Sequence, residues 1–167
     1  GKVDMTAPDV VTEMFAAYRT LLDSLEGKLG SAFSDAVDLL EGMSGTVVVC
    51  GMGKSGLVGA KITATLTSTG TPSVFLHPAE AMHGDLGIVR KGDVIILISN
   101  SGETEEITRL LPALKRLAVR IIALVGNVDS TMARAADICL DAAIDKEACP
   151  LNPVSYTHLR AHETYTY

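Results

Sequence analysis

The sequence lacks any apolar run that approaches the roughly 20 residues needed to cross a bilayer. Its first residues, Gly1 to Asp4, also lack the layout of a signal peptide, so no membrane partner is expected. Positive charge is scarce as well, because 14 lysines and arginines stand against 20 aspartates and glutamates, for a formal net charge of −6. With no basic face to neutralise a phosphate backbone, a nucleic-acid partner is not expected either.

Cysteine is rare, and Cys50, Cys139 and Cys149 form no Cys-x-x-Cys pair. An odd number of cysteines, two of them within apolar runs, is typical of reduced thiols and predicts a cytoplasmic location. The 167 residues, 47% of them hydrophobic, suffice for one globular domain with a substantial core.

The first forty or so residues carry apolar side chains at helical spacing. The pattern predicts one helix over about 8–27 and a second over about 31–43, ended by Gly42. Because an apolar helix ahead of a sheet domain often packs on a neighbouring subunit, we expect a homo-oligomer.

Short, continuous apolar runs follow, and they are typical of strands buried on both faces. The predicted strands are 46–50, 73–76, 94–98, 120–125 and 137–140. Helical segments are predicted after Gly53, from Glu103 to Leu117 and from Ser130 to Ala135. This alternation predicts an α/β fold, a three-layer, doubly wound (flavodoxin-like) five-stranded parallel sheet with N-terminal helices.

Two turns rich in glycine and hydroxyl groups, Gly51–Gly56 and Ser99–Thr104, each lie between a predicted strand and a predicted helix. A turn in that position presents free backbone N–H groups to an anion. Two of them in one small domain suggest a pocket for a phosphorylated metabolite.

The first turn matches the dinucleotide pattern G-x-G-x-x-G, but His77 and Pro78 stand where the second strand should end in an acid. A Walker A reading fails because its first glycine would fall on Val48. Lys54 is either a solvated lysine or a ligand for a phosphate or a developing enolate. The helix dipole favours the second interpretation, since a cation gains nothing at a helix start.

The second turn supplies three hydroxyls, those of Ser99, Ser101 and Thr104. Helix capping by Ser101 or Thr104 is the plain alternative, and it accounts for one hydroxyl better than for three. Three acids follow that would complement the dipole of the next helix: Glu103, Glu105 and Glu106. From spacing alone, Glu106 is either a solvated acid or a site acid. The loop 77–85 holds two histidines and two acids, but no second cluster with metal-ligand spacing accompanies it.

Taken together, four segments closely resemble the sugar isomerase (SIS) domain of bacterial D-arabinose 5-phosphate isomerases. They are Gly-Met-Gly-Lys-Ser-Gly at 51–56, the loop 77–87, the turn 99–107 and Lys-Glu-Ala-Cys-Pro-Leu at 146–151. The likeness runs in order from about residue 5 to Pro153, so residues 1–153 are expected to form the SIS domain.

The resemblance implies aldose–ketose isomerisation between D-arabinose 5-phosphate and D-ribulose 5-phosphate. That step feeds synthesis of 3-deoxy-D-manno-octulosonate, a sugar of lipopolysaccharide or capsule. It implies a set of substrate-binding residues: Ser55, Ser99, Asn100, Ser101, Thr104 and His83. It implies three catalytic residues: Lys54, Glu106 and Glu147. His83 is also linked in the family to a divalent metal, such as zinc, that inhibits, and no cofactor is required. Relatives are typically tetramers.

Beyond about Pro153 the sequence departs from the family's pattern, which continues with a closing helix, a Ser-His-Pro-Gly-Gly stretch and, in longer members, paired CBS domains. Residues 154–167 are interpreted as a cloning or sequence-assembly scar, with an ordinary polar extension as the alternative. His158 and His162 match no family motif, so we expect a chain that binds sugar phosphate but catalyses poorly or not at all. Two other functions stay open, a non-catalytic phosphosugar-binding module and an isomerase of another sugar phosphate.

Overall fold

The computed structural model describes residues 6–144, which fall into two compact units. Of the described residues, 6–27 and Ile144 belong to one unit, and residues 28–143 form the other. Within the first unit, Thr6 and Asp9 start the helix with a reciprocal capping box. The Thr6 amide donates to Asp9 Oδ2 at 3.0 Å, and the Asp9 amide donates to Thr6 Oγ1 at 3.4 Å.

Helix α1 (Ala7–Gly42) covers both of the helices predicted for the N-terminal region. The predicted break between them is present as a kink at Gly30, whose φ of 43° and ψ of −138° are not helical. Glycine tolerates this conformation because it has no Cβ. No helix within residues 6–144 is both long and apolar enough to cross a membrane.

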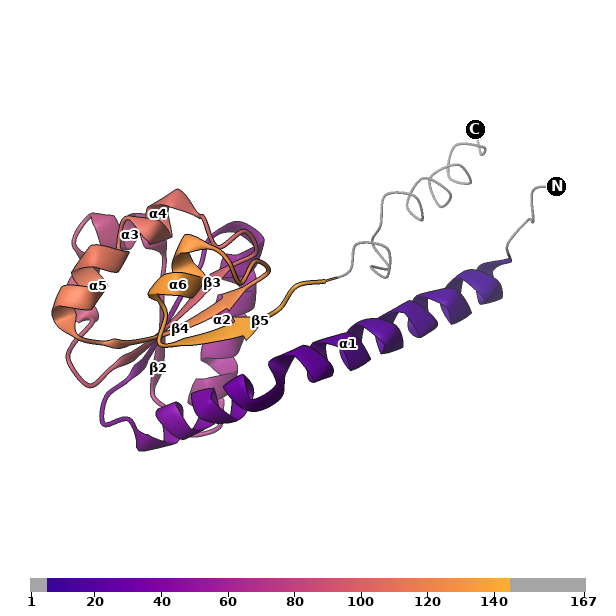
Figure 1. Ribbon diagram of the computed structural model, residues 1–167, viewed down its shortest axis with the longest axis horizontal. Helices are drawn as coiled ribbons and strands as arrows, with labels where there is room; N and C mark the ends of the chain where they lie inside the picture. Colours follow the sequence, from indigo (N-terminus) through magenta and orange to yellow (C-terminus); the bar gives the residue numbers. More distant parts are fainter. Residues whose placement is uncertain (1–5, 145–167) are drawn as a thin grey trace. The chain divides into compact units, whose positions relative to one another are not determined.

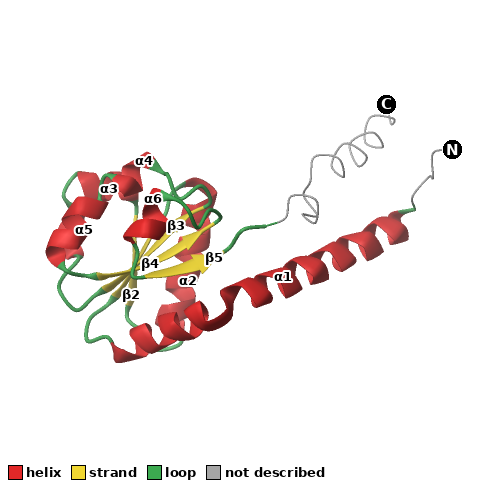
Figure 2. Ribbon diagram, in the orientation of Figure 1, coloured by secondary structure: helices red, strands yellow, loops and turns green. Residues whose placement is uncertain are grey.

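The predicted five-stranded parallel sheet is confirmed within the 28–143 unit (Figures 1 and 2). Its strands are β1 (Val47–Cys50), β2 (Ser73–Leu76), β3 (Val94–Ser99), β4 (Arg120–Val125) and β5 (Ile138–Asp141). They lie in the order β2-β1-β3-β4-β5, and every neighbouring pair is parallel. The central strands β1 and β3 are buried along their whole length, which explains their unbroken apolar sequences.

Helices cover both faces of the sheet, as the three-layer prediction required. On one face, the apolar core forms where the strands pack against the C-terminal part of α1 and against α2 (Gly53–Ser68). The core on the other face involves α3 (Pro78–Met82), α4 (Glu105–Thr108), α5 (Leu111–Leu117) and α6 (Thr131–Ala135). Figure 1 shows these four short helices together on one side of the sheet.

Two local predictions were wrong. The segment 77–85, expected to be a loop, contains α3 and is followed by the 3-10 helix η1 (Asp85–Ile88), which begins at its last residue. The single helix predicted from Glu103 to Leu117 is instead α4 and α5, separated at Arg109 and Leu110. Pro112 explains the separation, because it has no N–H to donate to the carbonyl of Thr108 one turn earlier.

Candidate functional site

The two glycine- and hydroxyl-rich turns lie at the same edge of the sheet. β1 and β3 are adjacent and parallel, with Cys50 in register with Leu97, so both turns follow the carboxyl ends of neighbouring strands. The chain first moves from β1 outward to β2 and then returns to the other side of β1 to form β3. The strand order therefore reverses between β1 and β3, and ligands of open α/β sheets bind in the crevice at such a point.

The first turn leaves the start of α2 open. Within the described chain, no side chain caps this helix at its N-cap residue Met52, and no acid lies in its first turn. Gly53 begins the helix with a φ of 60°. Gly51 and Gly56 pack closely, since a Cβ on Gly56 would lie 3.0 Å from the Gly51 carbonyl oxygen. The turn thus presents backbone amides and a positive helix end without a protein partner.

The second turn gathers its three hydroxyls into one hydrogen-bonded cluster. Ser99 Oγ lies 2.7 Å from Thr104 Oγ1 and 3.4 Å from Ser101 Oγ, and it accepts the Gly102 amide at 3.0 Å. Thr104 occupies the N-cap position of α4, but its side chain makes no capping hydrogen bond. Ser101 Oγ accepts the Glu103 amide instead of capping the helix. The capping alternative is therefore wrong for both residues.

The remaining predicted residues of the two turns are accessible to a ligand. Lys54, in the first turn of α2, and Asn100, directly after β3, are exposed, while Ser55 and Glu106 are half-buried. Glu106 lies in the first turn of α4. The structure thus brings the strand ends that carry these residues together, whereas Glu147, the other predicted catalytic acid, lies outside the described residues.

The three acids of the second turn have different environments. Glu105 pairs with Arg109 one helical turn away on the exposed side of α4. Glu103 precedes α4 and turns to another element: its Oε1 accepts the backbone amide of Thr131 at 2.7 Å. This hydrogen bond lowers the pKa of Glu103 below its usual value, with a smaller contribution from Arg134. Glu105 and Glu106 lie in the first turn of α4 as predicted, whereas Glu103 lies ahead of that helix and bonds the start of α6.

The histidines of the segment 77–85 have separate local environments. His77 Nδ1 accepts the Ala79 amide at 3.1 Å and caps α3, whereas His83 is exposed at the C-terminal end of that helix. Among residues 6–144, no group of three or more His, Cys, Asp or Glu side chains is placed to hold a metal ion. The described residues around His83 therefore do not form a metal centre, and its predicted role with an inhibitory metal stays a prediction.

Cys50 ends β1 directly before the first turn, but it is not a nucleophile for this site. Its side chain is fully buried, and burial raises the pKa of the thiol to about 12. Cys139, on β5, is half-buried, and burial together with the nearby Asp141 raises its pKa as well. Both cysteines carry free thiols in the described part of the chain.

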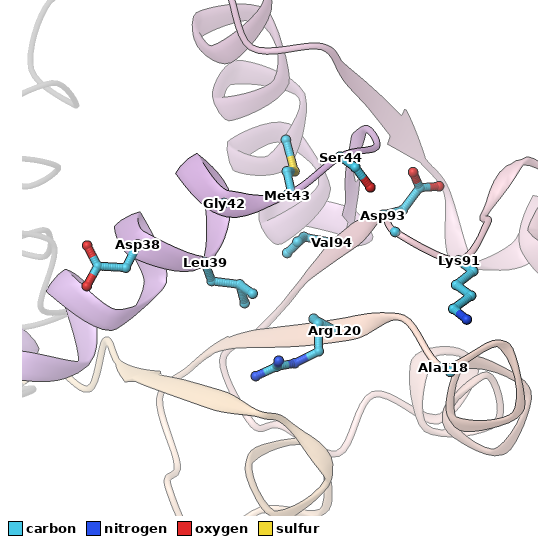
Figure 3. A pocket seen from close by; sticks show the side chains of 11 residues that line it. Asp38, Leu39, Gly42, Met43, Ser44, Lys91, Asp93, Val94, Ala118 and Arg120 are labelled. Atoms are coloured by element: carbon cyan, nitrogen blue, oxygen red, sulfur yellow. The ribbon is translucent and has the colours of Figure 1, made fainter.

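A cavity of about 610 Å³ lies at the opposite edge of the sheet (Figure 3). It is lined by the end of α1 and by the amino ends of β3 and β4, including Val94 and Arg120. Its buried acid, Asp93, already accepts the amides of Thr46 and Arg90, each at 2.8 Å. Each carboxylate oxygen thus accepts a backbone amide, so Asp93 stabilises the surrounding loops. We therefore place the candidate site at the carboxyl edge of the sheet and not in this cavity.

The fold defines a doubly wound α/β domain whose two glycine- and hydroxyl-rich turns share one edge of the sheet, and comparison with known proteins gives the family. The SIS domain matches residues 43–161, so the chain belongs to the SIS domain family. The matched range runs on into the segment 154–167 that the sequence analysis sets apart, which lies outside the described residues.

Curated relatives share about half of their aligned residues with this chain. It is 55% identical over 141 residues to arabinose 5-phosphate isomerase KdsD of Pseudomonas aeruginosa, covering 83% of this chain and 43% of the relative. It is 52% identical over 147 residues to the KdsD protein of Escherichia coli K12, covering 87% and 45%. The chain therefore spans less than half the length of these relatives.

Solved structures agree with the fold. A protein of E. coli CFT073 in complex with arabinose 5-phosphate superposes with a TM-score of 0.75 at 35% identity, over 97% of this chain and 95% of that one. A phosphoheptose isomerase from Francisella tularensis superposes with a TM-score of 0.67 at 21% identity, over 95% of each chain. The second likeness shows the shared fold alone.

The contacts between the second turn and α6 are the part of the site that the sequence analysis missed. Ser130, fully buried, caps α6 by accepting the Ala133 amide at 3.2 Å. Glu103 reaches the same helix from a turn 28 residues earlier in the sequence. A serine ahead of a short helical segment does predict the Ser130 cap, but no local pattern predicts a partner so distant along the chain.

Proposed function

We propose that this SIS domain binds a phosphorylated pentose at the carboxyl ends of β1 and β3 and interconverts D-arabinose 5-phosphate and D-ribulose 5-phosphate. The observation that carries the proposal is the Ser99, Ser101 and Thr104 cluster, whose hydroxyls gather around Ser99 Oγ instead of capping α4. The names of the curated relatives and the arabinose 5-phosphate complex of the E. coli CFT073 protein support the choice of substrate.

In this proposal the three residues of the hydroxyl cluster have different roles. Ser99 is only 2% exposed, and its Oγ already accepts the Gly102 amide, so it organises the turn. Ser101 is exposed and Thr104 half-buried, so a ligand can reach both hydroxyls, which in this proposal donate to phosphate oxygens. The uncapped start of α2 adds amides and a positive helix end on the neighbouring strand. Direct contact between Ser99 and phosphate stays a prediction, as do the contacts of Ser55, Asn100 and His83.

The chemistry requires a base and a group that stabilises an oxyanion. The isomerisation moves a proton between C1 and C2 through a cis-enediol, and a carboxylate can carry that proton. Glu106 or Glu147 would carry the proton, and the ammonium of Lys54 would stabilise charge that develops on the sugar oxygen. Neither step uses a metal or an organic cofactor, so zinc at His83 would act only as an inhibitor.

The proposal includes a homo-oligomer, with a tetramer as the specific expectation. α1 carries exposed apolar side chains spaced three or four residues apart, typical of a helix face that packs on another subunit: Val11, Met14, Phe15, Tyr18 and Leu22. A cytoplasmic location and a place in lipopolysaccharide precursor synthesis belong to the same proposal and rest on the family resemblance.

Binding and turnover should be measured separately. Calorimetry with D-ribulose 5-phosphate reports binding, and a coupled assay of ribulose 5-phosphate formation from arabinose 5-phosphate reports turnover. Ser101→Ala or Thr104→Val should weaken binding roughly ten- to hundredfold, since each removes one hydrogen bond to a charged group. Glu106→Gln or Lys54→Met should leave binding near that of the unaltered chain and lower turnover by about 10²- to 10⁴-fold.

Glu105→Gln is the matched control, because Glu105 neighbours Glu106 but pairs outward with Arg109. This variant should bind and turn over substrate as the unaltered chain does. Binding without turnover in the unaltered chain would favour the non-catalytic phosphosugar-binding module. Failure to bind any pentose phosphate would overturn the proposal.

A further inference from the structure

The turn 99–104 is held by the loop between β4 and α6 and by the start of α6 itself. The Gly126 amide donates to the Asn100 carbonyl at 2.9 Å, and the Met132 amide donates to the Gly102 carbonyl at 3.1 Å. The two hydrogen bonds attach the proposed phosphate-binding turn to the start of the β4–α6 loop and to the first turn of α6. The position of the hydroxyl cluster therefore depends on where the β4–α6 loop and the start of α6 lie.

The packing between these loops leaves no space for a side chain at two glycines. A Cβ on Gly102 would lie 2.0 Å from Ser130 Oγ, and one on Gly126 would lie 2.3 Å from Asn100 Oδ1. Both distances are far below van der Waals contact, so a side chain of the neighbouring segment occupies the space that a Cβ would need at each glycine.

The first three amides of α6 all have partners. The Thr131 amide donates to Glu103 Oε1 at 2.7 Å, the Met132 amide to the Gly102 carbonyl and the Ala133 amide to Ser130 Oγ. The start of α6 is therefore closed, in contrast to the start of α2, which no side chain caps within residues 6–144. One of these partners, the Glu103 carboxylate, is a side chain supplied by the turn itself.

We propose that Glu103 is a positioning residue, which caps α6 and thereby holds the Ser101 and Thr104 hydroxyls in the arrangement that binds phosphate. The effect on phosphate binding rests on the proposed function, whereas the hydrogen bond between Glu103 and Thr131 does not. A carboxylate beside a phosphate site would repel the ligand if it were free to swing toward it. Its bond to the Thr131 amide and the nearby Arg134 hold this charge on the α6 side of the turn.

Removing either partner should loosen the turn. In Glu103→Ala the acceptor is lost, whereas Glu103→Gln keeps an amide oxygen that can accept the same bond. Thr131→Pro removes the donor without disturbing the helix, because proline suits the first position of a helix. If both residues act through one hydrogen bond, the double variant Glu103→Ala/Thr131→Pro should be no worse than either single variant.

Two readouts test the proposal. In the isomerase assay, Glu103→Ala should raise KM for arabinose 5-phosphate roughly tenfold with kcat changed less than about threefold, and Glu103→Gln should recover most of the loss. Hydrogen exchange followed by mass spectrometry should show faster exchange in peptides covering 99–104 and 131–135 in Glu103→Ala and Thr131→Pro. Glu105→Gln should match the unaltered chain in both measurements.

The exchange measurement needs no substrate, so it separates this inference from the proposed function. If the chain neither binds nor converts a pentose phosphate but both variants exchange faster in the turn, the proposed function fails and the α6 contact stands. If exchange in 99–104 is the same in all variants, or if kcat falls while KM is unchanged, the positioning role is overturned.

Discussion

Gly102 is the position where one added methyl group should disturb the candidate site most. Its φ of 67° lies in the left-handed region, which costs a residue with a Cβ roughly 1–2 kcal/mol. The added Cβ would also lie 2.0 Å from Ser130 Oγ and 2.3 Å from Ser130 Cβ. Ser130 is fully buried and its hydroxyl caps α6, so it cannot rotate away without losing that bond. Overpacking of this kind adds roughly 1–3 kcal/mol.

Gly102→Ala should therefore lower the free energy of unfolding by roughly 2–5 kcal/mol. Gly53→Ala is a matched control, since Gly53 has a similar φ of 60° but nothing within 4 Å of an added Cβ. The free energy of unfolding of Gly53→Ala should fall only by the roughly 1–2 kcal/mol of backbone strain. Urea unfolding followed by circular dichroism measures both, and with an m-value of about 2 kcal/mol/M the loss in Gly102→Ala lowers the midpoint by about 1–2.5 M.

A double variant isolates the steric part of the effect. Ser130→Gly removes both atoms that the new Cβ would meet, and loss of the serine cap to glycine costs only a few tenths of a kcal/mol. Gly102→Ala in that background should cost about as much as Gly53→Ala. The reasoning is refuted if Gly102→Ala and Gly53→Ala have midpoints within about 0.3 M of each other in the unaltered background.

Two further predictions concern groups outside the turn. Asp93→Ala should lower the free energy of unfolding by roughly 2–5 kcal/mol, because it leaves the Thr46 and Arg90 amides without their acceptor. Asp93→Asn should lower the free energy of unfolding by less. Asp38 is an exposed acid of the same cavity, so Asp38→Ala should change that free energy by no more than about 0.5 kcal/mol in the same urea titration. With Cys139 and Cys149 changed to alanine, Cys50 should resist a thiol reagent at pH 8 until urea unfolds the chain, since a pKa of about 12 leaves roughly one thiol in 10⁴ ionised. Labelling of the folded variant at the rate of a free cysteine would contradict that burial.

Much of the architecture could be predicted because its signals are local in the sequence. The strands β1 and β3 are buried on both faces, so their apolar runs are unbroken and their ends fall close to the predicted residues. The break in α1 was also predictable, since Gly30 lies between the two periodic segments. In contrast, α3 begins with a cap from His77, a residue that seldom serves as an N-cap, and it was missed.

The sequence by itself determined which chemical groups stand at the ends of the strands, because the alternation of apolar runs and glycine-rich turns follows from burial and backbone geometry. Only the tertiary structure decided which of those groups hydrogen-bond to one another. Thr104 could have capped α4 and Glu103 could have had no partner outside its own turn, as their local sequence allows. Instead, the parallel sheet brings the β4–α6 loop against the turn, so that Glu103 bonds Thr131 and Thr104 bonds Ser99. Such contacts between distant segments depend on the relative position of whole strands, which no local pattern encodes.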